Sequence, residues 1–248
     1  MKMQTIIIMN FSNIYDNQDF YKNKQYKLLD CKDIISTNCI CSKKAESQLK
    51  ELIKQEPYNS IHFIDSGNYH YITKFWTDKI ERDFVLVVFD HHLDMQNNKM
   101  NQNLNCGNWI IKAMENQHLK KAILIGAKYN DDNVKICHGL SKVSIFNQVE
   151  SSKQENMQKI TSIIGEYPIY ISIDKDVMSS KVIETNWDQG TMSKNTLFKL
   201  LHFLILNNET IGLDICGACC DELAYISAIH KDDEFNLKLL NYLKMLSK

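Results

Sequence analysis

The sequence predicts an α/β fold, a three-layer α/β/α sandwich built around a mostly parallel sheet. Short apolar segments rich in β-branched residues alternate with helical segments along the 248 residues, which is the order typical of such sheets. The segment Phe84–Phe89 is apolar without a break, as expected of a strand that is buried on both faces. Residues 1–248 contain no repeat and no low-complexity segment, so we expect a single domain.

The first half of the chain alternates strands with helices. Apolar segments between turn-forming residues predict strands at residues 5–11, 61–65, 84–90 and 122–127. A helix is predicted from Ser42 to Gln55, because Ser42 can cap its first turn and an apolar stripe follows at helical spacing. Residues 12–42 are polar and predict irregular structure. A helix carrying Phe75 and Trp76 follows the second strand, and another is predicted from Trp109 to about Gln117.

The second half repeats this alternation. Strands are predicted at residues 143–146, 168–174 and 210–216. Helices are predicted at residues 154–164 and 194–206 and over the last 25 residues, where leucines recur at helical spacing. A long loop, residues 177–193, follows the strand 168–174 and should cover the carboxyl ends of the strands.

Bulk composition excludes several classes of partner. The net charge is −1, so the sequence has no basic footprint for nucleic acid or an anionic membrane. Its apolar runs are far shorter than the roughly 20 residues of a membrane-spanning helix. Disulfide frameworks are typical of small secreted domains, and this chain of 248 residues is not one. We therefore expect its eight cysteines to be reduced thiols. We therefore expect a cytoplasmic protein that binds neither nucleic acid nor a membrane.

Potential metal ligands follow the ends of three predicted strands. In parallel sheets ligands bind at the carboxyl ends of strands, and alternate residues there point to one side. Converging carboxylates would repel one another without metal, whereas two divalent ions would neutralise four of them. A carboxylate-rich set without a thiolate favours Mn²⁺ over structural zinc. The predicted ligands are His70, Asp90, His92, Asp94, Asp174 and Asp176.

Three motifs in this set resemble those of the arginase/agmatinase (ureohydrolase) family. Asp-His-His-Leu-Asp at residues 90–94 resembles that family's Asp-Ala-His-x-Asp signature. Ser-Ile-Asp-Lys-Asp at residues 172–176 matches its Ser-x-Asp-x-Asp signature, and Gly-Asn-Tyr-His at residues 67–70 is similar to a diverged Gly-Gly-Asp-His. The motifs occur in family order, and with the last strand they span most of the chain.

The resemblance implies an arginase-like fold and a binuclear manganese centre with two Mn²⁺ per chain. Carried over by position, one ion would be bound by His70, Asp90, Asp94 and Asp174. The other would be bound by Asp90, His92, Asp174 and Asp176, so that Asp90 and Asp174 bridge the two ions. Asp94 would also act as the catalytic residue, by orienting the attacking water toward a trigonal carbon that then loses an amine.

The substrate side of the sequence departs from the family pattern. The family's last strand typically ends in a Glu that pairs with the substrate guanidinium, but this chain has Gly217 there. The histidine that arginases use as a proton shuttle is replaced near Trp109, and position 91 is His where the family usually has Ala. The charge-assisted hydrogen bond that is lost contributes about 1.5–3 kcal/mol. We therefore expect a binuclear-manganese hydrolase of a non-peptide C–N bond in a guanidino, amidino or amide substrate other than arginine.

Candidate substrate contacts lie near the expected metal site. Asn108 belongs to the retained Gly-Asn of an arginase-like segment, and Trp187 and Asp188 lie on the long loop. Asp214 lies near the end of the last strand. The predicted substrate-binding residues are Asn108, Trp187, Asp188 and Asp214.

Two other functions are compatible with the sequence. One is a single-metal amide hydrolase related to the deacetylases that share this fold, although His70 and the pair Asp174 and Asp176 exceed what one ion needs. The other is a catalytically inactive metal-binding relative, suggested by the loss of the substrate Glu. The resemblance also implies a possible homo-oligomer, since members of the family are often trimers or hexamers.

Overall fold

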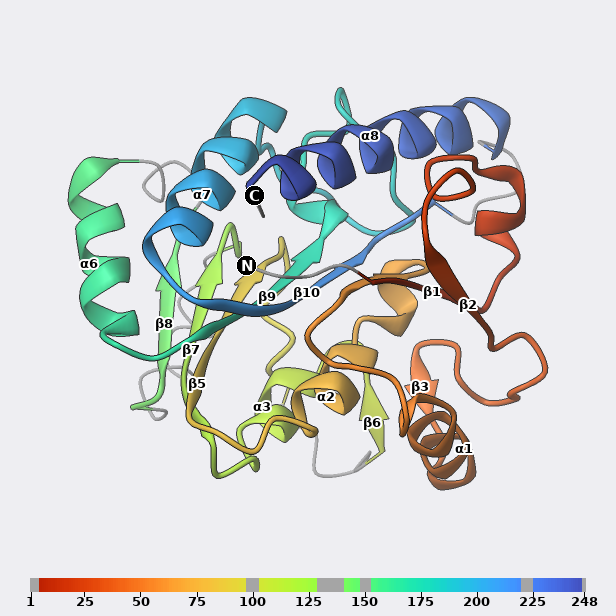
Figure 1. Ribbon diagram of the computed structural model, residues 1–248, viewed down its shortest axis with the longest axis horizontal. Coiled ribbons are helices and arrows are strands. Elements are labelled where there is room, and N and C mark those ends of the chain that lie inside the picture. Colours follow the sequence, from red (N-terminus) through yellow and green to blue (C-terminus); the bar gives the residue numbers. More distant parts are fainter. Residues whose placement is uncertain (1–4, 97–102, 129–140, 148–152, 220–224, 247–248) are drawn as a thin grey trace.

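An eight-stranded sheet in the order β2-β1-β4-β10-β9-β5-β7-β8 crosses the middle of the protein (Figure 1). The computed structural model describes residues 5–96, 103–128, 141–147, 153–219 and 225–246. All the strand pairs of this sheet are parallel. The strands are β1 (Ile6–Asn10), β2 (Tyr26–Asp30), β4 (Ile61–Ile64), β5 (Phe84–Phe89), β7 (Leu119–Ile125), β8 (Val143–Phe146), β9 (Ile169–Asp174) and β10 (Thr210–Cys216).

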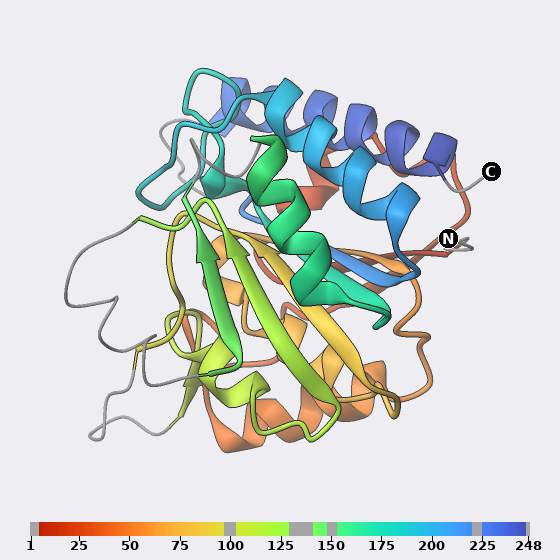
Figure 2. The same cartoon turned by 90° about the vertical axis from the view of Figure 1, so that its left-hand side faces the viewer.

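Helices cover both faces of this sheet, which confirms the predicted α/β sandwich (Figures 1 and 2). One face carries α1 (Lys43–Ile53), α2 (Ile72–Thr77) and α3 (Trp109–Ala113). The opposite face carries α6 (Gln154–Ile164), α7 (Lys194–Asn207) and α8 (Tyr225–Leu246). Short 3₁₀ turns are η1 (Ile14–Asn17), η2 (Gly67–Tyr69) and η3 (Lys175–Val177), and β3 (Ile40–Cys41) pairs antiparallel with β6 (Leu104–Asn105).

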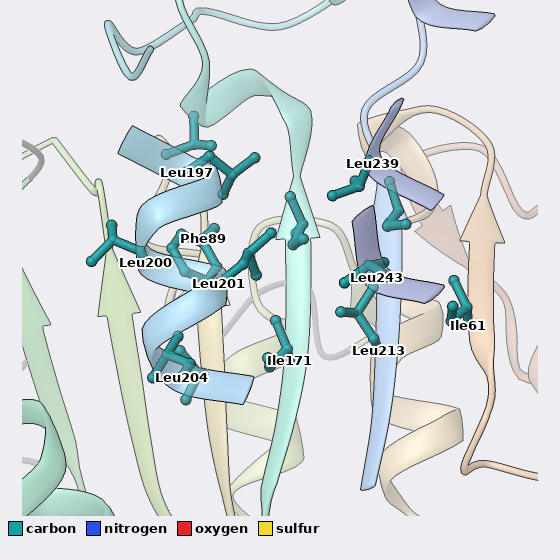
Figure 3. Packing of buried hydrophobic residues seen from close by; sticks show 14 of the residues in the cluster. Ile61, Phe89, Ile171, Leu197, Leu200, Leu201, Leu204, Leu213, Leu239 and Leu243 are labelled. Atoms are coloured by element: carbon teal, nitrogen blue, oxygen red, sulfur yellow. The ribbon is translucent and has the colours of Figure 1, made fainter. Parts of the chain in front are cut away.

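The central strands bury side chains on both faces, because each face meets a layer of helices. All six residues of β5 are buried, as the unbroken apolar segment predicted. Figure 3 shows leucines of α7 and α8 packed over the strands on one face. The labelled side chains there are Ile61, Phe89, Ile171, Leu197, Leu200, Leu201, Leu204, Leu213, Leu239 and Leu243.

The predicted boundaries are close to the observed ones, with two informative differences. The predicted cap of α1 is confirmed, since Ser42 Oγ accepts a hydrogen bond from the Ala45 amide at 3.2 Å. Residues 12–42, expected to be irregular, contain β2, an edge strand of which only Leu29 is buried. Such a strand carries no continuous apolar signal, because one edge and much of its surface face solvent. Helix α3 ends at Ala113 instead of near Gln117.

The strand order places four strand ends side by side. Strands β4, β10, β9 and β5 are consecutive neighbours and all parallel, so their carboxyl ends lie at one edge of the sheet. The predicted metal ligands lie at or just after the carboxyl ends of β4, β5 and β9. In the part of the chain that the structure describes, no helix combines the length and apolar character needed to cross a bilayer.

Candidate metal centre

The six side chains predicted as metal ligands lie together at this edge of the sheet. Asp90, His92 and Asp94 follow β5, while Asp174 ends β9 and Asp176 lies in η3. His70 comes after β4, at the end of η2. Among the described residues, three sets of possible ligand atoms each fall within 4.8 Å of one another. Two of these sets consist of predicted ligands only, one of His70, Asp90 and Asp94 and one of Asp90, His92 and Asp176. Asp90 belongs to both, as expected of a residue that bridges two ions.

One side of the centre is built from His92 and two carboxylates. His92 Nδ1 lies 2.8 Å from Asp176 Oδ2 and 3.6 Å from Asp90 Oδ1. Backbone amides fix both carboxylates, because the His92 amide donates to Asp90 Oδ1 at 2.6 Å and the His91 amide donates to Asp176 Oδ1 at 3.0 Å. The two motifs therefore hold each other in place.

The other side of the centre is organised by His70. Its Nε2 lies 2.9 Å from the hydroxyl oxygen of Ser172, the first residue of the second motif. This contact turns Nδ1 toward the carboxylates, at 3.1 Å from Asp90 Oδ2, 3.2 Å from Asp94 Oδ2 and 3.6 Å from Asp174 Oδ2. An imidazole fixed in this way by a partner on its second nitrogen is typical of a metal ligand.

The chemistry of the donor set fits divalent ions. His70 Nδ1 and Asp90 Oδ2 are buried, and neither makes a well-aligned hydrogen bond. Burial, followed by repulsion from neighbouring carboxylates, raises the pKa of Asp174 and of Asp176 above the usual range. Burial lowers the pKa of His92, but hydrogen bonds to Asp176 and Asp90 outweigh it and raise that pKa to about 11. Bound cations would offset the repulsion among these carboxylates.

Asp94 is held by an indole. Trp109 Nε1, at the start of α3, donates a hydrogen bond to Asp94 Oδ2 at 2.6 Å. The backbone at Asp94 has φ +48°, in the left-handed region, and its carbonyl accepts from the Ile110 amide at 3.2 Å. This turn bends the chain back after β5, so that the Asp94 carboxylate faces His70.

Cys216 is a further member of the centre that the sequence analysis did not include. It ends β10 in register with Asp174 of β9, and its Sγ lies 3.2 Å from Asp174 Oδ2. Burial and the neighbouring Asp174 raise the pKa of this thiol well above its ordinary value. The position of Cys216 beside Asp174 depends on the register of β10 with β9, which the sequence alone does not indicate.

A cavity of roughly 450 Å³ opens beside the ligands. Its wall includes three of the four predicted substrate contacts, Asn108, Trp187 and Asp188. Both polar groups of the Asn108 amide already bind the backbone of residues 103 and 105, so Asn108 shapes the wall more than it offers free donors. The remaining lining includes Asp90, His91, His92, Asp94, Asp174, Asp176, Cys39, Ile40, Gly67, Leu93, Met95, Gln96, Asn105, Cys106, Gly107 and Lys128.

The mouth of the cavity carries charged and aromatic side chains. Lys128 Nζ lies 3.4 Å from Asp188 Oδ2, and His91 Nε2 lies 3.6 Å from the same oxygen. Trp187 Nε1 donates to Asn68 Oδ1 at 2.8 Å, which ties the long loop to η2. His91 and Lys128 were not among the predicted substrate contacts, and their role at the mouth depends on the folding of two separate loops.

Asp214, the fourth predicted substrate contact, does not reach the cavity. It is buried in the middle of the sheet, where its Oδ1 accepts from the Tyr170 hydroxyl and lies near His62 Nδ1, each at 2.6 Å. That prediction therefore needs correction: Asp214 belongs to a structural hydrogen-bond network. The reason is its position two residues before the end of β10, inside the helix-covered part of the sheet.

Comparisons with known proteins place this site in a wider context. The model of the Arginase family matches residues 6–216. An uncharacterized protein of Thermotoga maritima is 28% identical over 238 residues, which is 96% of this chain and 89% of that relative. The family match includes all six predicted ligands as well as Cys216.

Solved structures of similar fold include two enzymes. A hypothetical agmatinase from Burkholderia thailandensis aligns with a TM-score of 0.65 and 17% identity over 98% of this chain and 87% of its own. Formiminoglutamase from Trypanosoma cruzi, in a structure with Mn²⁺, aligns with a TM-score of 0.68 and 10% identity over 97% of this chain and 94% of its own. At these identities the likeness establishes the fold.

Proposed function

This chain belongs to the arginase family, and on that premise we propose that it is a binuclear-metal hydrolase of linear C–N bonds. The proposed substrate is a small guanidino, amidino or amide compound other than arginine. The observation that carries the proposal is the convergence of two aspartate pairs on one cavity, with His70 buried beside these carboxylates. His70 Nδ1 and Asp90 Oδ2 are buried and lack well-aligned hydrogen-bond partners. The agmatinase and formiminoglutamase of similar fold support the reaction class.

The metal ions would be bound by the two sets of side chains described above. Asp90, His92 and Asp176 offer oxygen and imidazole donors, a combination that suits Mn²⁺. When bound, a pair of divalent ions lowers the pKa of a water molecule enough for it to lose a proton at neutral pH. The ions also polarise the bond that is broken. His70, held by Ser172, would contribute the nitrogen donor on the other side.

The chain itself would position the reacting groups. We assign the catalytic role to Asp94, whose carboxylate borders the cavity and can accept a proton or a hydrogen bond from the attacking water. Trp109 would fix the orientation of that carboxylate, because its indole donates to Oδ2. Trp187 and Asp188 would contact the substrate from the long loop.

The choice of substrate follows from the end of β10. Gly217 has φ +87°, and a Cβ added there would lie 2.3 Å from Asp174 Oδ1 and 2.7 Å from the Lys175 amide. The backbone therefore leaves no place for a Glu at this position. A guanidinium has no carboxylate partner there, which favours a neutral group or one recognised from the mouth of the cavity.

A screen with metal-loaded protein tests the proposal. Release of urea, ammonia or amine would be measured over a panel of guanidino, amidino and acyl-amine compounds. We expect turnover of at least one compound and a decrease of about 10²–10⁴-fold in Asp94→Asn, the range for loss of a general acid–base group. Two bound ions without any turnover would instead favour the inactive relative, and a single ion with amide turnover would favour the deacetylase-like alternative.

We further propose that the protein acts in the cytoplasm and forms a homo-oligomer. The cysteines that the structure describes are Cys31, Cys39, Cys41, Cys106, Cys216 and Cys219, and all are free thiols. Free thiols fit a reducing compartment. The proposal of a homo-oligomer rests only on the likeness to the family.

A further inference from the structure

Cys216 brings a sulfur atom to the His70 side of the centre. Its Sγ lies 3.2 Å from Asp174 Oδ2, and the same carboxylate oxygen lies 3.6 Å from His70 Nδ1. Ligand atoms of these three residues fall within 4.8 Å of one another, which makes a third possible ligand set at this edge of the sheet. Cys216 and His70 are each 1% exposed.

The unsatisfied nitrogen of His70 points independently to an ion at this place. Ser172 occupies Nε2, whereas Nδ1 is buried and makes no well-aligned hydrogen bond. In a tetrahedral site with bonds of about 2.1 Å to nitrogen or oxygen and 2.3 Å to sulfur, neighbouring ligand atoms are about 3.4–3.6 Å apart. The distances of 3.2 and 3.6 Å that join Cys216, Asp174 and His70 are close to this spacing.

We propose that Cys216 is a thiolate ligand of the ion on the His70 side, and that this position prefers Zn²⁺ or another thiophilic ion over Mn²⁺. The inference rests on the proposed metal centre and deepens it. Thiolates are soft ligands that select zinc-like ions, whereas carboxylates suit Mn²⁺. The set of Asp90, His92 and Asp176 contains no sulfur, so the two positions would differ in the ion they select.

Local structure explains how the sulfur reaches this position. Cys216 is the last residue of β10, and the register with β9 places it opposite Asp174. Gly217 then turns the chain with a positive φ, and its missing side chain leaves Asp174 free to approach. When an ion binds, the thiol proton leaves to solvent, as expected for any cysteine ligand.

Cobalt substitution tests this role without any need for turnover. The metal-free protein would be titrated with Co²⁺ alone while cobalt content and the near-ultraviolet spectrum are followed. We expect a sulfur-to-cobalt charge-transfer band that grows with the first equivalent of bound cobalt. A wild-type protein that binds cobalt without this band would overturn the role of Cys216 and leave the proposed function in place, whereas a protein that binds no cobalt would overturn both.

Two serine variants locate the sulfur. Cys216→Ser should bind cobalt without the band, while Cys106→Ser, which changes a thiol that lines the cavity but belongs to no ligand set, should keep it. The metal-free protein would also be offered Zn²⁺ and Mn²⁺ at equal concentrations. The ratio of bound Zn²⁺ to bound Mn²⁺ should be at least about tenfold lower in Cys216→Ser than in the wild type. Tenfold is the smallest loss of metal affinity typical when even a hydrogen-bond partner of a ligand is removed. A band that persists in Cys216→Ser, or an unchanged preference for Zn²⁺, would refute the proposal. If Cys216→Ser fails to fold, the wild-type spectrum still decides.

Discussion

Lys175 separates the two aspartates of the second motif, and its side chain forms a fully buried ion pair with Asp232 of α8. Asp174 and Asp176 lie at the metal centre, whereas the side chain of Lys175 between them reaches α8 on the opposite face of the sheet. Asn236 and Gln18 complete the arrangement, since Gln18 Nε2 donates to Asp232 Oδ2 at 2.8 Å and Asn236 Oδ1 accepts from Lys175 Nζ at 3.3 Å. The C-terminal helix is thus anchored directly behind the ligands.

Removal of one partner of this pair should destabilise the protein strongly. Asp232→Asn leaves a buried ammonium group without its counter-charge, and such losses cost about 3–5 kcal/mol. The double variant Lys175→Met/Asp232→Leu removes both charges and should recover most of this loss. The measurement is the free energy of unfolding of the metal-free protein in urea.

The control for this prediction is the exposed pair of Lys159 and Glu155 on α6. Glu155→Gln should leave the unfolding midpoint unchanged, because exposed ion pairs contribute little. A double variant that is as unstable as Asp232→Asn would show that packing at this position matters more than charge pairing.

Much of the fold was predictable because the sheet is parallel and covered on both sides. Strands β5 and β9 bury every residue, so β5 is apolar throughout and β9 is interrupted only by Ser172 before Asp174. Asp90 follows β5 directly, and Asp174 is the last residue of β9. The ligands recur at a spacing of two residues just past those ends. Edge strand β2 was missed, because four of its five residues are exposed and leave no such pattern.

The less predictable parts of the site depend on contacts between segments that are distant in the sequence. The proximity of Cys216 to Asp174 depends on the β9–β10 register, and neither residue alone indicates it. Burial of Asp214 depends on how far the helices cover β10. Trp109 was noted only as a replacement for the shuttle histidine, and its contact with Asp94 requires the left-handed turn at that residue.

The contact between Trp109 and Asp94 should contribute to metal affinity. Trp109→Phe keeps an aromatic ring but removes the hydrogen bond to Oδ2, so Asp94 loses its fixed orientation. Loss of an outer partner of a ligand typically weakens metal binding by about 10–100-fold. Calorimetric titration of the metal-free protein with Mn²⁺ and Zn²⁺ measures this effect.

Trp187→Phe serves as the matched control, because its indole donates to Asn68 at the mouth and contacts no predicted ligand by hydrogen bond. Its metal affinity should equal that of the wild type. Equal affinities in Trp109→Phe and the wild type would mean that Asp94 is held by its backbone alone.

Asp90 should be required for both ions, because it takes part in two ligand sets. Elemental analysis of wild-type protein loaded with excess divalent ion should show close to two ions per chain. Asp90→Asn should lose both, and with them the stabilisation by bound metal, which is about 2.7 kcal/mol at a free ion concentration of 100 times Kd. The metal-free form of Asp90→Asn should melt at the same temperature as the wild type or higher, since repulsion among the carboxylates is relieved.

Asp188→Asn is the control here, because Asp188 borders the same cavity but is exposed and belongs to no ligand set. It should keep two ions. A stoichiometry of one or less in the wild type under excess metal would contradict the binuclear centre. Strong destabilisation of metal-free Asp90→Asn would show that Asp90 supports the fold instead.

The last prediction concerns arginine, agmatine and Gly217. Neither compound should be hydrolysed efficiently by the metal-loaded protein, because position 217, where the family's Glu would pair with a guanidinium, is a glycine. A catalytic efficiency of about 10⁴ M⁻¹s⁻¹ or more on either compound, within the usual range of enzymes, would show that another group supplies the missing charge.

Gly217→Glu should not restore arginase activity, because the new side chain cannot fit beside the ligands. Its Cβ would lie 2.3 Å from Asp174 Oδ1, at a backbone φ of +87° that side chains rarely adopt, so Asp174 would have to move and metal content should fall. Gly165→Ala separates backbone strain from the steric contact with Asp174. Gly165 also has a positive φ, +61°, but no atom lies within 4 Å of a Cβ added there. That control should lose about 1–3 kcal/mol of stability from backbone strain alone and keep its metals. Retention of both ions together with hydrolysis of arginine by Gly217→Glu would contradict this prediction. It would show that a Glu can fit beside Asp174 and bind a guanidinium.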